Sequence, residues 1–183
     1  MSHKSVLDFG ERVITKDMVT SKKVLEVGSY DVNGSLRPYI ESLKPADYVG
    51  TDIELGPRVD QVVPVSDLIK VFGKASFNLV LCNEMLEHAE DWREAINQLK
   101  AVTQKWLLIT TRSEPFPYHG FPGDHWRYNR ELFKKIFADM QIINLEDDSE
   151  YPGIFILAKK TLTPAVDLSK IEVIPAPPKP HWH

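Results

Sequence analysis

Short apolar runs alternate along this sequence with segments whose apolar residues recur at helical spacing, and this alternation constrains the fold more than any other feature. Six runs have the length and composition of strands: residues 24–27, 48–53, 62–65, 77–82, 106–110 and 154–158. Three stripes have the period of amphipathic helices: residues 36–43, 92–102 and 132–140. Strands that are apolar on both faces are typical of a parallel sheet with helices on both sides. We therefore predict an open, Rossmann-like α/β sandwich, in which ligands bind beyond the carboxyl ends of the strands.

The chain of 183 residues is long enough for one domain with a core of its own. We expect residues 1–21 to form a helical cap across the sheet and residues 22–161 to form the main domain. Residues 162–183 hold five of the 13 prolines. Because proline lacks a backbone N–H, we expect these residues to run as an extended tail that continues neither a helix nor the sheet.

Charge and cysteine content exclude several classes of function. The net charge of −4 argues against broad, sequence-independent binding of nucleic acid, which needs an excess of Lys and Arg on one face. The single cysteine, Cys82, excludes an internal disulfide and a multi-cysteine zinc site, and its apolar neighbours predict a buried structural thiol. No apolar run approaches the roughly 20 residues of a membrane span, and residues 1–21 have no signal-peptide core. We expect a cytoplasmic location, no membrane contact and no obligate protein partner.

A glycine-bearing turn follows the first predicted strand and suits the close approach of a nucleotide-like ligand at Gly28. The dinucleotide fingerprint requires glycine at the third and sixth turn positions, where this chain has Tyr30 and Asn33. The strand carries a carboxylate instead, Glu26, and the second predicted strand ends on Asp52. A carboxylate at Glu26 repels a pyrophosphate but suits a cationic amine, and one at Asp52 suits both ribose hydroxyls. The pair indicates S-adenosylmethionine; the alternatives are a strand-end ion pair for Glu26 and a turn or cap role for Asp52.

Three motifs, in this order, resemble the class I S-adenosylmethionine-dependent methyltransferases, specifically the small single-domain type 11 group. They are Val24-Leu25-Glu26-Val27-Gly28-Ser29, then Gly50-Thr51-Asp52-Ile53, then the stretch from Phe77 to His88. The resemblance covers about residues 22–160 and implies a seven-stranded sheet whose last strand is antiparallel, inserted by a hairpin of residues 141–149 and 153–161. It implies S-adenosylmethionine contacts from Glu26, Gly28, Ser29, Tyr30, Asp52, Ile53, Asn83 and Met85. The family usually has a second glycine at position 30, where this chain has Tyr30.

Two carboxylates and an imidazole follow the strand at 77–82. Glu84, Glu87 and His88 are spaced i, i+3 and i+4, so they share one face if the segment is helical. Such a set can bind a divalent cation, with His119 or His125 as a fourth ligand. Some relatives with this Glu-x-x-Glu-His spelling use a divalent metal, namely ubiquinone-pathway O-methyltransferases and the 2′-O-methyltransferases of small-RNA 3′ ends. Many type 11 members have no known metal, and we predict no metal here, with Glu84, Glu87 and His88 kept as the alternative.

A long loop, residues 111–128, follows the strand at 106–110 and is rich in aromatic, His, Arg and Pro residues. Because loops of this length without secondary structure are usually functional, we predict that it lines the methyl-acceptor site. The candidate catalytic bases are His88, His119, Asp124 and His125, and the candidate acceptor-binding residues are Arg112, Tyr118, Trp126 and Arg127. The alternative is a self-packed loop in which Asp124 pairs with Arg127 and Trp126 fills the core.

These features favour a methyltransferase that acts on a hydroxyl group of a small molecule or sugar. One alternative is a metal-assisted enzyme acting on the 2′-hydroxyl of an RNA 3′ end. Another is a module that binds S-adenosylmethionine without catalysis. Glu26 and Tyr30 disfavour a dehydrogenase.

Overall fold

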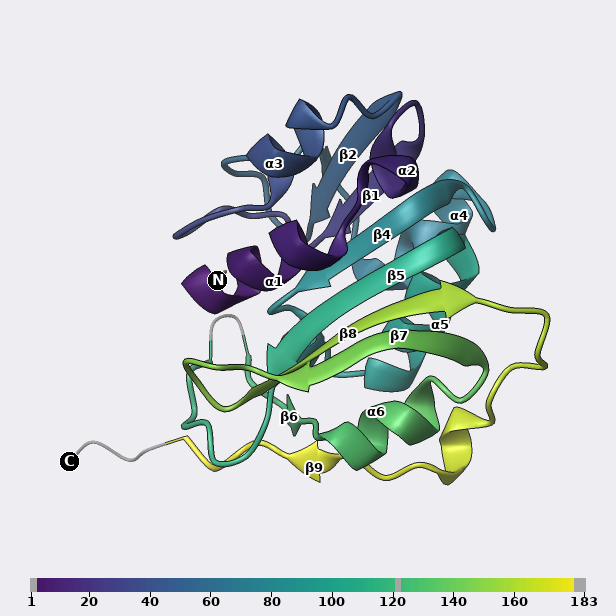
Figure 1. Ribbon diagram of the computed structural model, residues 1–183. Helices are drawn as coiled ribbons and strands as arrows, with labels where there is room; N and C mark the ends of the chain where they lie inside the picture. The colour runs from purple at the N-terminus through teal and green to yellow at the C-terminus, as the bar shows by residue number, and fades with distance from the viewer. Residues whose placement is uncertain (1–2, 121–122, 180–183) are drawn as a thin grey trace.

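A computed structural model describes residues 3–120 and 123–179, and its centre is a seven-stranded sheet (Figure 1). The strands follow the order β3-β2-β1-β4-β5-β8-β7. Their bounds are β1 (Lys23–Val27), β2 (Asp47–Asp52), β3 (Gln61–Val62), β4 (Phe77–Asn83), β5 (Thr103–Arg112), β7 (Met140–Asp147) and β8 (Gly153–Lys160). All pairings are parallel except those of β8, which runs antiparallel to both β5 and β7. The predicted sheet, with its hairpin-inserted antiparallel strand, is confirmed.

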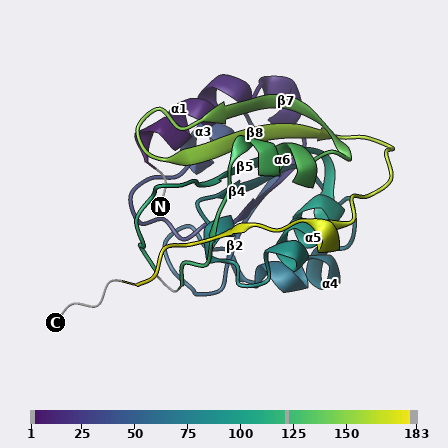
Figure 2. The ribbon, with the colours of Figure 1, turned by 90° about the horizontal axis from the view of Figure 1, so that it is seen from below.

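Helices cover both faces of the sheet, and a separate apolar cluster fills each interface (Figures 1 and 2). One face carries α1 (Lys4–Val13), α2 (Lys16–Val19) and α3 (Arg37–Ser42). The other carries α4 (Leu68–Phe72), α5 (Trp92–Val102) and α6 (Arg130–Ile136). The strands β1, β4 and β5 are buried on both sides, which explains their unbroken apolar runs. Cys82 is fully buried in β4, as predicted, and burial raises the pKa of its thiol well above the ordinary value.

Local sequence signals set the ends of the helices. The N-cap carboxylate of Asp91 accepts a hydrogen bond from Glu94 N at the start of α5, and Asn129 does the same for Leu132 N at the start of α6. The prediction for residues 92–102 matches α5, whereas the stripe at 132–140 is shared between α6 and the first residue of β7. The expected strand at 62–65 is wrong beyond residue 62, because Pro64 cannot donate to a ladder and a 3₁₀ turn follows it.

The C-terminal segment is more structured than its proline content suggests. It contains a 3₁₀ turn, η3 (Leu168–Lys170), and a strand, β9 (Ile174–Pro175), which pairs antiparallel with β6 (Trp126–Arg127). Leu168 and Ile171 are buried in the core, and Arg93 donates to both of their carbonyl oxygens at 3.0 and 2.7 Å. The expectation that this tail continues no sheet is therefore wrong. Figure 2 shows it crossing the molecule beside α5.

None of the helices in the described ranges combines the length and the apolar character needed to cross a bilayer.

Candidate functional site

The carboxyl ends of β1, β2, β4 and β5 meet at one edge of the sheet, and most of the predicted site residues follow these ends. The turn after β1 depends on Gly28, whose φ is +77°. A Cβ atom at Gly28 would lie 2.7 Å from the Met85 Cβ, so only glycine fits. The amides of Gly28 and Ser29 both donate to the Thr51 carbonyl, at 2.8 and 3.0 Å. The turn is thus fixed between β2 and the residue that follows β4.

Asp52 closes β2 beside that turn. Its carboxylate accepts hydrogen bonds from the amides of Tyr30, at 3.0 Å, and Ile53, at 2.7 Å, one on each oxygen. A carboxylate offers about four acceptor positions, so each oxygen keeps one for a ligand hydroxyl. Ile53 is 52% exposed, an apolar side chain open to a flat ring. These groups fit the ribose and base of S-adenosylmethionine.

Tyr30 occupies the turn position where the resembled family usually has glycine. Its ring lies against Gly56 in the loop after β2, with ring carbon Cε2 2.1 Å from the place that a Cβ of Gly56 would take. The missing side chain at Gly56 therefore makes room for Tyr30. The aromatic ring therefore lies over the loop after β2 and stays 40% exposed.

Glu26 lies in β1 with only 3% of its surface exposed. The Tyr48 hydroxyl donates to its Oε2 at 2.6 Å. Burial raises the pKa of Glu26 to about 7, although the bond from Tyr48 and the charge of Arg37 act in the opposite direction. A cation approaching this buried carboxyl would favour its ionised form.

The end of β4 does not form the helix that the Glu84, Glu87 and His88 spacing suggested. Glu84 adopts a φ of +51°, and a single 3₁₀ turn, η2 (Leu86–His88), follows. The Glu84 carboxylate turns away to pair with the guanidinium of Arg112. Burial and the nearby Glu87 carboxylate raise the pKa of Glu84. The alternative metal set of Glu84, Glu87 and His88 is thus not brought together by the structure.

Glu87 instead meets two imidazoles. Its Oε1 lies 4.0 Å from His88 Nε2 and 3.8 Å from His119 Nε2, and the three ligand atoms lie within 4.8 Å of one another. The other oxygen, Oε2, accepts a 2.8 Å hydrogen bond from the Thr111 hydroxyl. Burial lowers the pKa of His119, so its ring is neutral at physiological pH. Two of the four candidate bases, His88 and His119, therefore lie together beside Glu87, after the carboxyl end of β4.

Asp124 and Arg127 have a different role from the predicted one. All five N–H groups of Arg127 are used: they bond both oxygens of Asp124 and the carbonyls of Phe116, Pro117 and Trp126. The pairing holds the pKa of Asp124 at about 2 even though burial acts to raise it, so this carboxylate is a poor base at neutral pH. Arg127 is fully buried and has no donor left for an acceptor. The self-packed alternative is correct for this pair.

Other residues of the loop also hold the chain together. Arg112, expected to bind the acceptor, is 1% exposed and pairs with Glu84 and Asp148. The Trp126 indole donates to the carbonyls of Ala89 and Glu90 at 3.0 and 3.1 Å.

His125 does not belong to the cluster of Glu87, His88 and His119. Its contact with Glu87 is through the backbone, where the His125 amide donates to the Glu87 carbonyl at 2.9 Å. Tyr118 remains half-buried beside Gly120. Asn83 is buried at the end of β4, where its Oδ1 accepts a 3.4 Å hydrogen bond from the Thr110 hydroxyl.

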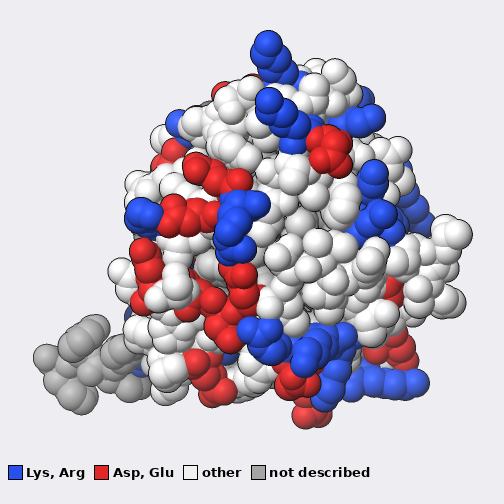
Figure 3. Space-filling model, in the orientation of Figure 1, with Lys and Arg blue, Asp and Glu red and all other residues white. Residues whose placement is uncertain are grey.

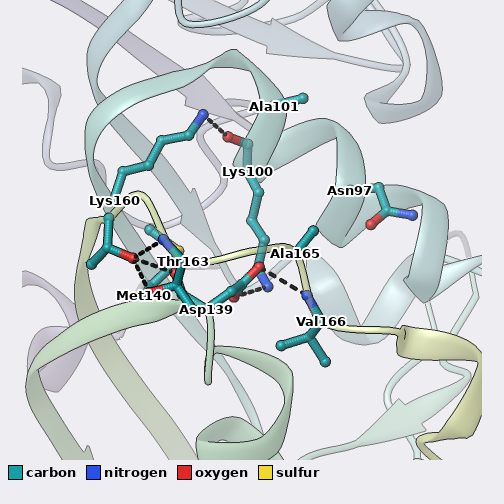
Figure 4. Close-up of a pocket in the computed structure, with 10 residues that line it drawn as sticks. Asn97, Lys100, Ala101, Asp139, Met140, Lys160, Thr163, Ala165 and Val166 are labelled. Atoms are coloured by element: carbon teal, nitrogen blue, oxygen red, sulfur yellow. Dashed lines mark hydrogen bonds and ion pairs between the residues drawn. The ribbon is translucent and has the colours of Figure 1, made fainter.

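A pocket at the opposite edge of the sheet is lined by two lysines that already pair within the protein (Figure 4). Lys100 pairs with Asp139 at 2.6 Å and donates to the Ile136 carbonyl at the same distance. Lys160 donates to the carbonyls of Lys100 and Thr103 at 2.9 and 2.7 Å. Both lysines are thus engaged within the protein, and the carboxyl edge of the sheet remains the candidate active site.

Residues 2–146 match the family described as a methyltransferase domain. No curated protein sequence matches the chain. Among solved structures, magnesium protoporphyrin IX methyltransferase from Synechocystis PCC 6803, with bound S-adenosylmethionine, superposes with a TM-score of 0.66 at 15% identity over 87% of this chain and 80% of that chain. A methyltransferase of Archaeoglobus fulgidus gives 0.66 at 14% identity over 87% and 95% of the two chains. A putative methyltransferase of Haloferax volcanii, in complex with the Trm112 activator, gives 0.66 at 12% identity over 86% and 89%.

The match covers most of the chain, and the sheet order and the glycine turn agree with it. The chain therefore belongs to the methyltransferase domain family and is a class I enzyme that uses S-adenosylmethionine as its methyl donor.

Proposed function

We propose that this enzyme transfers the methyl group of S-adenosylmethionine to a hydroxyl oxygen of a small molecule or sugar. One observation carries the proposal: the buried Glu87 carboxylate and the imidazoles of His88 and His119 meet after the carboxyl end of β4, the strand that pairs with β1. A hydroxyl must lose its proton to become a good nucleophile, and imidazoles beside a carboxylate suit that task.

Cofactor binding is assigned to the ends of β1, β2 and β4. Asp52 accepts hydrogen bonds from the ribose hydroxyls, and Ile53 and Tyr30 cover the base and ribose. Glu26 receives the cofactor's amino group as its carboxyl ionises, because the ammonium favours the charged form. Gly28 and Ser29 would let the backbone approach the ligand, and Asn83 and Met85 would contact it from the end of β4.

The transfer itself is a single displacement in which the protein mainly aligns the reactants. The hydroxyl proton leaves, the oxygen forms a bond to the methyl carbon, and the methyl–sulfur bond breaks with its electron pair on sulfur. S-adenosylhomocysteine and a methyl ether are the products. The donor is already activated by its positive sulfur, so the residues of this chain act on the acceptor.

Charge and internal pairing support a small acceptor over RNA. The net charge is −4, and on the face drawn in Figure 3 the Lys and Arg side chains are interspersed with Asp and Glu. Both arginines of the acceptor loop, Arg112 and Arg127, are engaged in internal ion pairs. Phosphate binding needs free cations along one face. The cytoplasmic location expected from the sequence is part of the same proposal.

Radiolabelled S-adenosylmethionine incubated with the enzyme and fractionated cell extract tests the proposal. We expect label in the small-molecule fraction, in a product that survives mild base, as a methyl ether does and a methyl ester does not. The Asp52→Asn variant is the control that should transfer little label. Label confined to RNA or protein, or released by mild base, would contradict the assignment of a small hydroxyl acceptor.

A further inference from the structure

One oxygen of Glu87 has no hydrogen-bond partner, although the side chain is completely buried. Oε2 is satisfied by the Thr111 hydroxyl at 2.8 Å, whereas Oε1 makes no hydrogen bond. A buried carboxylate oxygen without a partner costs about 1–3 kcal/mol or more. Oε1 points toward the space between the rings of His88 and His119. The fold therefore keeps an unpaired acceptor in a place where a cation would satisfy it.

Both rings present a lone pair to the same space. The Nδ1–H of His88 donates to the Gly123 carbonyl, and the Nδ1–H of His119 donates to Asp124 Oδ2 at 3.0 Å. A carbonyl and an ionised carboxylate only accept, so each Nδ1 carries the proton. In the neutral ring, Nε2 is then the atom with the lone pair, and the two Nε2 atoms lie 4.0 and 3.8 Å from Glu87 Oε1. An imidazole whose other nitrogen is bonded in this way is the usual form of a metal-ligating histidine.

We propose that Glu87, His88 and His119 bind a divalent transition-metal ion, such as Zn²⁺, through one carboxylate oxygen and two imidazole nitrogens. Imidazole ligands favour Zn²⁺, Fe²⁺ or Co²⁺ over Mg²⁺ or Ca²⁺, which prefer sites built from oxygen. Three protein ligands leave at least one position of the ion open, as in catalytic rather than structural sites.

The spacing of the ligand atoms needs only a small closure. Atoms that share a tetrahedral ion at the usual bond lengths lie about 3.3–3.6 Å apart. Here Oε1 lies 3.8 and 4.0 Å from the two nitrogens, and no two of the three atoms are more than 4.8 Å apart. Small rotations of the two rings bring the nitrogens to bonding range. The side chains of His88 and His119 are 16% and 19% exposed, so an ion can reach them from solvent.

The surrounding residues hold His119 and Asp124 in place. Asp124, which orients His119, is itself fixed by the bidentate pair with Arg127. The His119 amide also donates to Asp124 at 3.0 Å, so ring and backbone are tied to the same carboxylate. Arg127 thus supports the proposed site from behind, which accounts for a fully buried arginine in this loop.

A catalytic role for the ion rests on the proposed function. The ion would take the acceptor oxygen in its open position and lower the pKa of the hydroxyl, whose proton then leaves to solvent. The imidazoles would act as ligands in this scheme rather than as proton acceptors. Metal binding itself stands on the geometry alone and is tested without turnover.

The test is titration of the metal-free protein with Zn²⁺ by calorimetry and with Co²⁺ by visible absorption. His181 and His183 are replaced by Gln in every sample, because exposed imidazoles also bind these ions; both lie outside the described residues. We expect one ion per chain and a Co²⁺ spectrum of a histidine-ligated site. Losing a residue that only hydrogen-bonds a metal ligand weakens metal binding ~10–100-fold. Glu87→Gln and His119→Gln each remove a ligand itself and should weaken binding at least as much. The matched control His125→Gln should keep the full affinity.

The proposal is overturned if the starting protein binds neither ion at micromolar concentration, or if Glu87→Gln binds as tightly as His125→Gln. If His119→Gln fails to fold, the metal affinity of the nearly isosteric Glu87→Gln variant decides whether the proposal stands. S-adenosylmethionine affinity is measured for the same samples. A protein that binds the ion but not S-adenosylmethionine would refute the proposed function and leave the metal site standing; the reverse result would refute only the metal site.

Discussion

The Glu26→Gln substitution should show that this buried carboxyl costs stability and serves the cofactor. Burial raises the pKa of Glu26 from 4.5 to about 7. A carboxyl whose pKa is raised on folding contributes stability that is complete below pH 4.5 and is lost as the pH rises through about 7. The difference corresponds to about 3 kcal/mol. Gln is uncharged at every pH and can still accept the hydrogen bond of Tyr48.

Urea denaturation of the cofactor-free protein at several values from pH 5 to pH 8 measures this effect. We expect wild type and Glu26→Gln to be similarly stable at pH 5, with the variant more stable by about 3 kcal/mol at pH 8. The Tyr48 hydroxyl lowers the pKa of Glu26, so Tyr48→Phe should move the loss of stability to higher pH. Wild-type affinity for S-adenosylmethionine should increase as the pH rises through about 7, whereas that of Glu26→Gln should be weak and constant. A stability difference that stays the same from pH 5 to pH 8 would refute the reasoning.

Three further substitutions test the site's architecture. Gly28→Ala forces a Cβ to 2.7 Å from the Met85 Cβ at a φ of +77°, and should lower stability by more than ~1 kcal/mol in thermal unfolding; an unchanged melting temperature would count against the turn geometry. Arg127→Lys leaves Asp124 and several carbonyls without partners. It should lower the free energy of unfolding, measured by urea denaturation, by about 3–5 kcal/mol, and a decrease below about 1 kcal/mol would contradict the pairing of Arg127 with Asp124. Arg93→Ala removes two bonds to the C-terminal segment, which limited proteolysis should then cut faster; equal rates would show that the core contacts hold it alone.

Periodic elements were predictable from the sequence because burial imposes their pattern. All of the stripe residues of α5 are buried. The glycine turn and Asp52 lie in motifs at strand ends, whereas the seven-stranded sheet with its antiparallel last strand was implied by the family resemblance. The pairing of β9 with β6 joins residues about 50 positions apart and involves a proline, so no local signal announces it. Proline is tolerated there because β9 is a two-residue edge strand.

The side-chain partners in the loop were harder to predict than its location. The i, i+3, i+4 spacing of Glu84, Glu87 and His88 assumed a helix, but the positive φ of Glu84 sends its carboxylate to Arg112. His119, which is 32 positions further along the chain, lies beside Glu87 instead of Glu84. Such contacts depend on how the loop folds back on itself. The Asp124–Arg127 spacing was the one local signal for that fold, and it appeared only as an alternative.

Isothermal titration of the purified protein with S-adenosylmethionine tests the central claim most directly. Asp52→Asn removes the charge that we propose holds the ribose, and Asp47→Asn, at the other end of the same strand, is the matched control. We expect one cofactor per chain for wild type and for Asp47→Asn, with binding about 10–100-fold weaker in Asp52→Asn, as the loss of a hydrogen-bonded charge implies. A wild-type protein that binds no S-adenosylmethionine, or an Asp52→Asn variant with unchanged affinity, would contradict the assignment of the site.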